Sequence, residues 1–86
     1  MMTHFLGTVR EFVVENFLYG DTGKLDIDTS FLETGVIDST GMLELVGFLE
    51  SRYNIQVKDE EFLPENLDSL ANIEKFLARK LNGEGR

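Results

Sequence analysis

Asp38 and Ser39 stand side by side where a glycine-containing loop gives way to an amphipathic stretch, Thr40–Tyr53. A carboxylate beside a hydroxyl could indicate nucleophilic catalysis, but a catalytic serine needs a positioned base. The single histidine, His4, is far away in the sequence. Asp38 is instead suited to cap a helix, because its carboxylate can accept a backbone N–H left without a partner in the first turn. Without a base, Ser39 can only serve as an exposed acceptor for another enzyme, and from these two residues alone an ordinary helix cap with a serine beside it is the more common arrangement. We expect no catalytic residue and no metal site in this chain.

The residues after Ser39 have the periodicity of an amphipathic helix. One face carries the apolar side chains expected in the core, which are Met42, Leu45, Val46, Leu49 and Tyr53. The opposite face is expected to meet solvent, and it carries Thr40, Leu43, Glu44, Gly47 and Ser51. Ser39 lies at the helix tip, on the border between these faces. Gly41 and Gly47 inside the helix either allow the close approach of a bound group or a partner, which we favour, or are simply tolerated.

The stretch from Gly35 through Asp38 and Ser39 to Tyr53, with Glu44-Leu45 and Leu49-Glu50 between them, resembles the acyl and peptidyl carrier proteins. In that family the serine carries a 4′-phosphopantetheine arm derived from coenzyme A. A phosphopantetheinyl transferase attaches the arm, whose thiol holds the cargo as a thioester. The resemblance implies that Ser39 is the attachment point and that Asp38 helps to bind Mg²⁺ and the transferase. It also implies a carrier and not an enzyme.

The same resemblance implies partners with basic docking patches: an acyl- or aminoacyl-loading ligase, and downstream transferases or synthases. The expected contact face is the exposed side of the helix, with Thr40, Leu43, Glu44 and Gly47. The family often has leucine at the position of Thr40. Because threonine is less apolar than leucine, we expect a weaker apolar contact at the base of the arm in this protein. Fatty acyl, specialised acyl and aminoacyl cargo all remain open, with a slight preference for a specialised pathway. The alternative is an acidic helical adaptor without a prosthetic group, in which Ser39 would be dispensable.

Composition supports a single small domain. The chain has 86 residues, 42% of them apolar, and no cysteine, so helix packing and not disulfides must stabilise it. The net charge of −8 argues against nucleic-acid binding. All of this charge lies in residues 28–68, which favours steering toward basic partners over a merely solvated surface. Neither a signal peptide nor a membrane-spanning run is present, so we expect a cytoplasmic protein without membrane contact.

The element pattern predicts an all-α fold. We expect a first helix capped by Thr3 and running to about Leu18, then a long loop to Asp38. After the central helix we expect an extended link, one helical turn over residues 59–63 that Pro64 limits, and a last helix from Leu70 to Leu81. From the resemblance to the carrier proteins, we expect these elements to form a small four-helix bundle with a long first loop and a short third helix. Residues 1–86 would form one free-standing, monomeric carrier domain with a loose tail at 83–86.

Several side chains can be placed from the same patterns. The anchors of the long loop are expected to be Phe31, Leu32, Val36 and Ile37. Asp68 or Ser69 is expected to cap the last helix. The buried face of that helix is expected to hold Leu70, Ile73, Phe76, Leu77 and Leu81, while Lys75, Arg79 and Lys80 complement its negative end.

Overall fold

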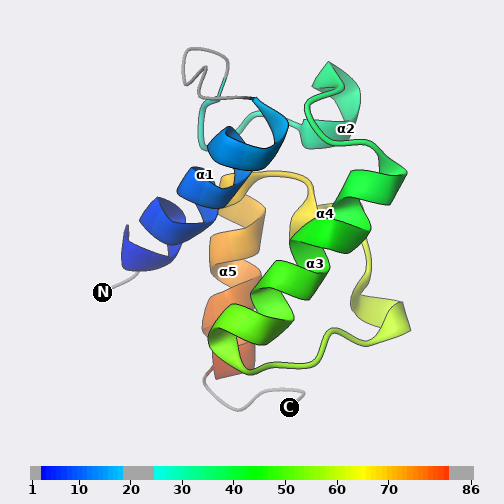
Figure 1. The fold of residues 1–86 in the computed structure, drawn as a ribbon. Helices are drawn as coiled ribbons and strands as arrows, with labels where there is room; N and C mark the ends of the chain where they lie inside the picture. The colour runs from blue at the N-terminus through cyan, green and yellow to red at the C-terminus, as the bar shows by residue number, and fades with distance from the viewer. Residues whose placement is uncertain (1–2, 19–24, 82–86) are drawn as a thin grey trace.

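The computed structural model describes residues 3–18 and 25–81, and the helices among them build one core (Figure 1). The three longer helices are α1 (Thr3–Phe17), α3 (Ser39–Tyr53) and α5 (Leu70–Leu81). The shorter ones are α2 (Phe31–Thr34), the 3₁₀ turn η2 (Asp59–Glu61) and α4 (Pro64–Leu67). No strand occurs in these two ranges, so the predicted all-α fold is confirmed. None of the described helices is long and apolar enough to cross a membrane.

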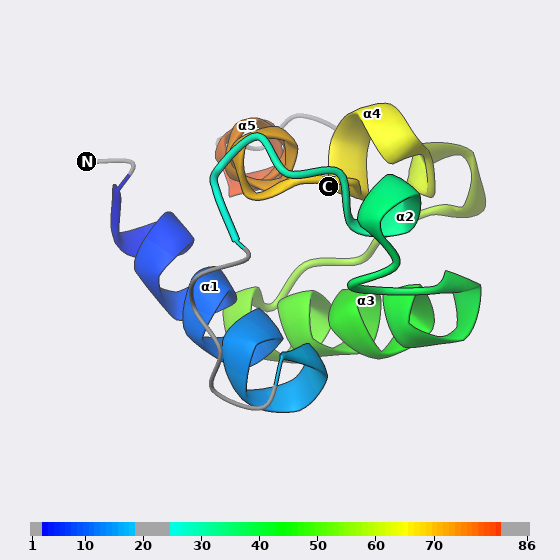
Figure 2. The ribbon, with the colours of Figure 1, turned by 90° about the horizontal axis from the view of Figure 1, so that it is seen from above.

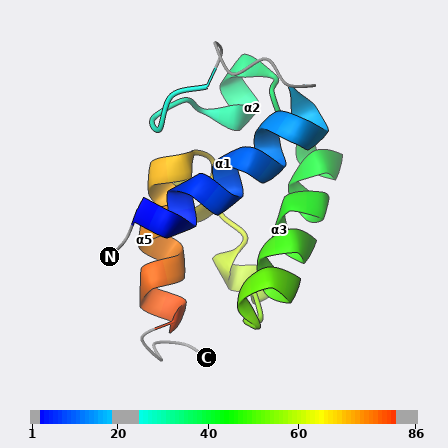
Figure 3. The same cartoon turned by 60° about the vertical axis from the view of Figure 1, so that its left-hand side comes forward.

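The long helices pack through the apolar faces that their periodicity predicts. Figure 3 shows α1 crossing between α3 and α5, which lie on either side of it. Each helix contributes side chains that are almost fully buried, including Val9 and Val13 from α1, Leu45 and Leu49 from α3, and Ile73 and Leu77 from α5. On α3 the predicted core positions are confirmed, except that Tyr53 is only half-buried. The side chains of Phe5 and Leu6, which belong to the same stripe of α1, lie outside the described residues.

The loop before α3 is more structured than its sequence indicates. Residues 25–38 contain the single-turn helix α2, which Ser30 caps by accepting the backbone N–H of Glu33 at 3.1 Å. Gly35 ends this turn with φ +79°, a left-handed conformation that glycine adopts without strain. Phe31 and Ile37 are buried as expected, but Leu32 is 41% exposed, so its predicted role as a core anchor is wrong.

The segment between α3 and α5 also departs from the prediction. The predicted turn is observed as η2, and Leu63 before Pro64 is extended, as predicted. Pro64 also begins a turn that was not predicted, because it occupies the first position of α4, where its missing N–H costs nothing. Figure 2 shows α2 lying between α4 and the end of α3 that begins at Ser39. Two of the short helices, α2 and α4, thus lie on the side of the α3 end that carries Ser39.

The last helix begins as predicted, and Ser69 is its cap. The Ser69 hydroxyl accepts the backbone N–H of Asn72 at 3.1 Å, while Asp68 bonds to the loop before α3. Leu81 is half-buried, so the prediction that it is a core residue is only partly met. Lys80, expected to complement the negative end of the helix, is buried with 1% of its surface exposed. The predicted tail at 83–86 lies outside the described residues.

Candidate functional site

The junction between the loop and α3 places Ser39 at the exposed tip of a helix. Asp38 has extended backbone angles and is the N-cap, and its Oδ1 accepts the backbone N–H of Gly41 at 2.7 Å. The Asp38 carbonyl accepts the N–H of Met42 at 2.9 Å, which closes the first turn. Ser39 is therefore the first helical residue, and its side chain is exposed. The local geometry expected from the Asp-Ser pair is confirmed.

The loop that delivers this pair is fixed by its neighbours. Ile37 is buried, and its N–H donates to the carbonyl of Phe31 at 3.2 Å. The carboxylate of Asp68 holds α2 from the far side, because it accepts the Ser30 hydroxyl and the Leu32 N–H. The N–H of Phe31 also donates to the Asp68 carbonyl at 2.9 Å. The position of Ser39 thus depends on a junction 29 residues further along the chain.

Gly41 has a packing role that the sequence does not reveal. A Cβ at this position would lie 2.8 Å from Cε1 of Phe17, closer than real contacts allow, and 3.0 Å from Cγ2 of Ile37, which is a tight contact. Gly41 therefore lets the start of α3 pack against the end of α1, so the favoured explanation, approach by a bound group or partner, is wrong for this glycine. Gly47 is different, because it is exposed and a Cβ there would meet open space.

The outward side of α3 presents the predicted partner face. Thr40, Leu43, Glu44 and Gly47 are all exposed, and Leu43 has 63% of its surface in solvent. A large leucine so exposed, one turn from Ser39 and beside a carboxylate, can supply an apolar contact with an acidic neighbour. The placement of these four residues on one exposed face is as predicted. Their role in partner binding remains a prediction.

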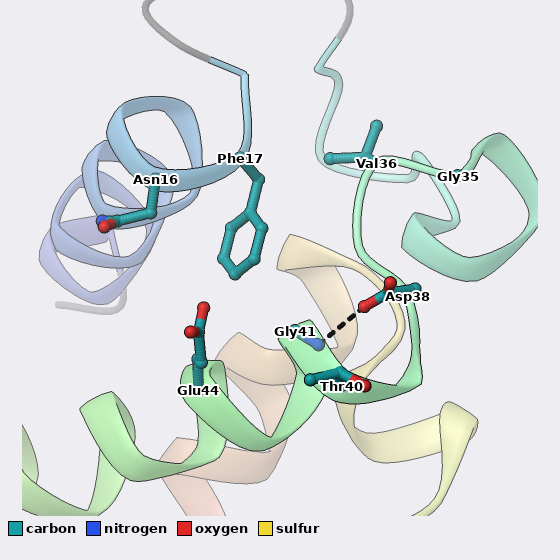
Figure 4. Close-up of a pocket in the computed structure, with 8 residues that line it drawn as sticks. All are labelled: Asn16, Phe17, Gly35, Val36, Asp38, Thr40, Gly41 and Glu44. Carbon is teal, nitrogen blue, oxygen red and sulfur yellow. Dashed lines mark hydrogen bonds between the residues drawn. The ribbon is translucent and has the colours of Figure 1, made fainter.

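An open pocket of about 370 Å³ lies between the end of α1 and the start of α3 (Figure 4). The Asp38 and Glu44 side chains stand on different sides of it, with the Phe17 ring and the Asn16 side chain on its α1 side. It is polar and acidic. Across the part of the chain that the structure describes, no group of three or more His, Asp or Glu residues could hold a metal ion.

The site has the chemistry of an acceptor. Among the described residues no side chain forms a hydrogen bond with the Ser39 hydroxyl, so no base within these ranges activates it as a nucleophile. The first-turn N–H groups and the positive end of the helix dipole favour an anion, such as a phosphodiester, at this tip. The donors present therefore fit a phosphate-linked group on Ser39.

Two features of the surroundings were missed from the sequence. One is an apolar groove of about 160 Å³, lined by Leu32, Met42, Phe62, Leu63, Pro64 and Leu67. The other is an ion pair between Lys80 and Glu61, the residue that precedes Phe62 of that groove. Proline followed by Glu-Asn-Leu is a helix-start signal that could have located α4. No local signal distinguishes Lys80 from an ordinary basic residue at a helix end.

A small acidic helical domain that presents an exposed serine at a helix tip fits a carrier that other enzymes load. Comparison with known families identifies which one. A model described as "Phosphopantetheine attachment site" matches residues 8–77, and the chain belongs to this family of phosphopantetheine-binding carrier proteins. It carries phosphopantetheine and is not a catalyst. Family membership thus favours the carrier over the adaptor without a prosthetic group.

Three relatives carry the name D-alanyl carrier protein. The chain is 37% identical over 73 residues to the D-alanyl carrier protein of Leuconostoc citreum (strain KM20), a match that covers 83% of this chain and 90% of the relative. It is 38% identical, with the same coverage, to the D-alanyl carrier protein of Leuconostoc mesenteroides. The corresponding protein of Streptococcus pyogenes serotype M1 is 32% identical over 77% of this chain and 86% of its own length.

A solved structure supports the fold independently. One chain in a crystal structure of an FAD-dependent dehydrogenase superposes on this protein with a TM-score of 0.71 and 26% sequence identity. The match covers 80% of this chain and 97% of the other. As a carrier, the protein works with a phosphopantetheinyl transferase and a loading enzyme.

Proposed function

We propose that Ser39 carries the phosphopantetheine arm and that the cargo is an aminoacyl group of the D-alanyl type. The observation that carries the attachment proposal is the exposed Ser39 hydroxyl at the first position of α3, inside the region that the family model matches. When bound, the arm supplies the thiol that holds the cargo as a thioester. The shared name of the relatives supports the aminoacyl cargo.

The attachment reaction uses Ser39 as the acceptor. The Ser39 Oγ forms a bond to the 4′-phosphorus of coenzyme A, the phosphoanhydride bond breaks, and 3′,5′-ADP leaves. The hydroxyl proton passes to a base of the transferase, because the described residues offer none. Asp38 contributes by ordering the tip: one oxygen caps Gly41, and the other has no hydrogen bond among the described residues. That second oxygen can face the Mg²⁺ held by the transferase.

The partner face of α3 is proposed to guide docking. Leu43 offers an apolar centre, and Glu44 offers a carboxylate to a basic patch. Thr40 and Gly47 flank them and leave room for a partner backbone, since a Cβ at Gly47 would meet nothing within 4 Å. Because coenzyme A is an intracellular metabolite, we place the modification in the cytoplasm.

The test is the intact mass after incubation with coenzyme A, Mg²⁺ and a promiscuous phosphopantetheinyl transferase. The wild-type protein should gain the mass of one arm, while Ser39→Ala should gain none. Ser51→Ala is the matched control, because Ser51 is an exposed serine of the same helix, and this variant should be modified like the wild type. An arm on Ser39→Ala, or none on folded wild-type protein, would refute the attachment proposal.

The cargo is tested on the protein that already bears the arm. With ATP and a D-alanine-activating ligase, the mass should increase by one alanyl group, and hydroxylamine should release it as expected for a thioester. L-alanine and a fatty acid, each offered with an enzyme that activates it, are the comparisons. Loading by the fatty-acid enzyme at a rate equal to that of D-alanine would contradict the aminoacyl assignment and leave the attachment site intact.

A further inference from the structure

Lys80 is an unusual residue in this fold because its charge is buried. Only 1% of its surface is exposed, and its ammonium lies 2.9 Å and 3.2 Å from the two carboxylate oxygens of Glu61. The ammonium also lies 5.9 Å from the centre of the Phe76 ring, within the range of a cation–π contact. Glu61 additionally accepts the Lys58 N–H at 3.0 Å. One end of η2 is thus tied to the last turn of α5.

A second set of hydrogen bonds connects α5 to the segment between η2 and α4. Arg79, the preceding residue of α5, donates to Oδ1 of Asn66 at 2.9 Å. The amide nitrogen of Asn66 donates to the Glu61 carbonyl at 2.9 Å, and the same carbonyl accepts the Leu63 N–H at 2.9 Å. Two consecutive residues of α5 therefore fix the backbone on both sides of Phe62 and Leu63.

Phe62 and Leu63 form one wall of the apolar groove. Met42, one turn after Ser39, and Leu32 of α2 line the groove with them. Phe62 is 37% exposed and Leu63 is 40% exposed, so both apolar side chains meet solvent. Three exposed acidic residues, which we call the acidic border of the groove, lie within two positions of groove residues in the chain: Glu33 follows Leu32, Glu60 lies two residues before Phe62, and Glu65 lies two residues after Leu63.

An ion pair with one buried partner is a poor way to stabilise a fold, since desolvation of the buried charge offsets much of the attraction. Its better-attested use is to fix one geometry. We propose that Lys80 and Glu61 are positioning residues: they hold Phe62 and Leu63 so that the groove receives an apolar side chain from a basic segment of the phosphopantetheinyl transferase. The acidic border supplies the charge complementarity for such a segment. This inference rests on the proposed modification of Ser39.

The experiment measures arm attachment kinetics for full-length Lys80→Met, Glu61→Gln and the double variant. Because the groove acts in docking, each single variant should raise KM for the carrier by about fivefold, with kcat unchanged. The double variant should be no worse than either single variant, because the two residues act as one unit. Lys75→Met and Glu15→Gln remove the same charges from exposed positions outside the groove and its acidic border, and each should change KM by less than about twofold.

A second readout needs no partner. The methyl NMR signals of Leu32, Met42, Leu63 and Leu67 should shift in Lys80→Met and Glu61→Gln and stay in place in the two controls. A lower unfolding temperature with unchanged methyl signals and KM would show a merely structural pair and overturn the proposal. Shifted methyl signals with unchanged KM would overturn the docking role. If the wild-type protein gains no arm, the proposed function fails, while the methyl spectrum still decides whether the pair positions the groove.

Discussion

The two connections that flank α3 have similar secondary structure, but they are held in place differently and present different residues to solvent. The upstream connection (residues 25–38) and the downstream connection (residues 54–69) each contain a single-turn α-helix. The upstream connection is held by buried apolar anchors, by backbone hydrogen bonds and by the Asp68 carboxylate, and it ends at Ser39. The downstream connection also has buried anchors, Ile55 and Leu67, but its exposed residues Phe62 and Leu63 lie in a segment bonded to the charged side chains of Arg79 and Lys80.

This difference matches what each connection must do. A modified serine has to stand at one place for every enzyme that visits it, and apolar anchors in a close-packed core provide that rigidity. A recognition surface instead needs exposed apolar side chains, which cannot anchor themselves in the core. Charged ties from a neighbouring helix can fix their backbone while their side chains remain in solvent. The two connections meet at Asp68, which binds the α2 turn.

The largest expected effect tests whether the upstream connection depends on its anchors. Phe31→Ala should lower the free energy of unfolding by about 3–5 kcal/mol, because it removes a fully buried ring from the core. Leu32→Ala, at the neighbouring exposed position, should cost less than about 1 kcal/mol. Chemical denaturation of both variants measures the contrast. Equal losses would show that α2 is not anchored as the structure indicates.

How far the sequence predicts these connections depends on the range of the interactions involved. The Asp38 cap and the faces of α3 follow from local spacing, and they were predicted. The α2 turn, held by Asp68, and the α4 turn, which packs on α5, were missed because a single turn is too short to be stable without tertiary contacts. The burial of Lys80 could not be predicted, since its partner Glu61 lies 19 residues away in a separate element.

The second prediction compares two glycines of α3. Gly41→Ala should destabilise the protein by about 1–2 kcal/mol, because the clash with Phe17 and Ile37 exceeds the gain in helix propensity. Gly47→Ala should stabilise it by about 0.5–1 kcal/mol, since a methyl group there meets open space. Thermal unfolding of the two variants checks the opposite signs. A stabilising Gly41→Ala would mean that the contact between α1 and α3 adjusts readily.

The third prediction separates the two roles assigned to Asp38. Asp38→Ala should cost about 0.5–2 kcal/mol, because the Gly41 N–H loses its capping acceptor. Asp38→Asn should keep nearly all of that stability, since asparagine caps helices as well as aspartate does. The Asn variant should nevertheless be modified more slowly by the transferase, because its side chain offers no charge to Mg²⁺. Denaturation curves and attachment rates for both variants test this separation. If Asp38→Asn is modified at the wild-type rate, Asp38 acts only as a helix cap and has no role toward Mg²⁺.

The smallest expected effect is a pH dependence confined to the downstream connection. Burial alone would raise the pKa of Glu61, but the Lys58 N–H and the Lys80 ammonium together lower this pKa below its usual value of 4.5. A carboxyl group whose pKa is lower in the folded state contributes stability above its unfolded pKa and loses it as the pH falls through the folded value. The stability gap between the wild type and Glu61→Gln should therefore be constant near neutral pH and shrink below about 4.5. Unfolding curves between neutral and acidic pH measure this gap. Glu60→Gln controls for the change in net charge, and a gap that stayed constant in acid would show that the Lys80–Glu61 pair does not favour the ionised form of Glu61.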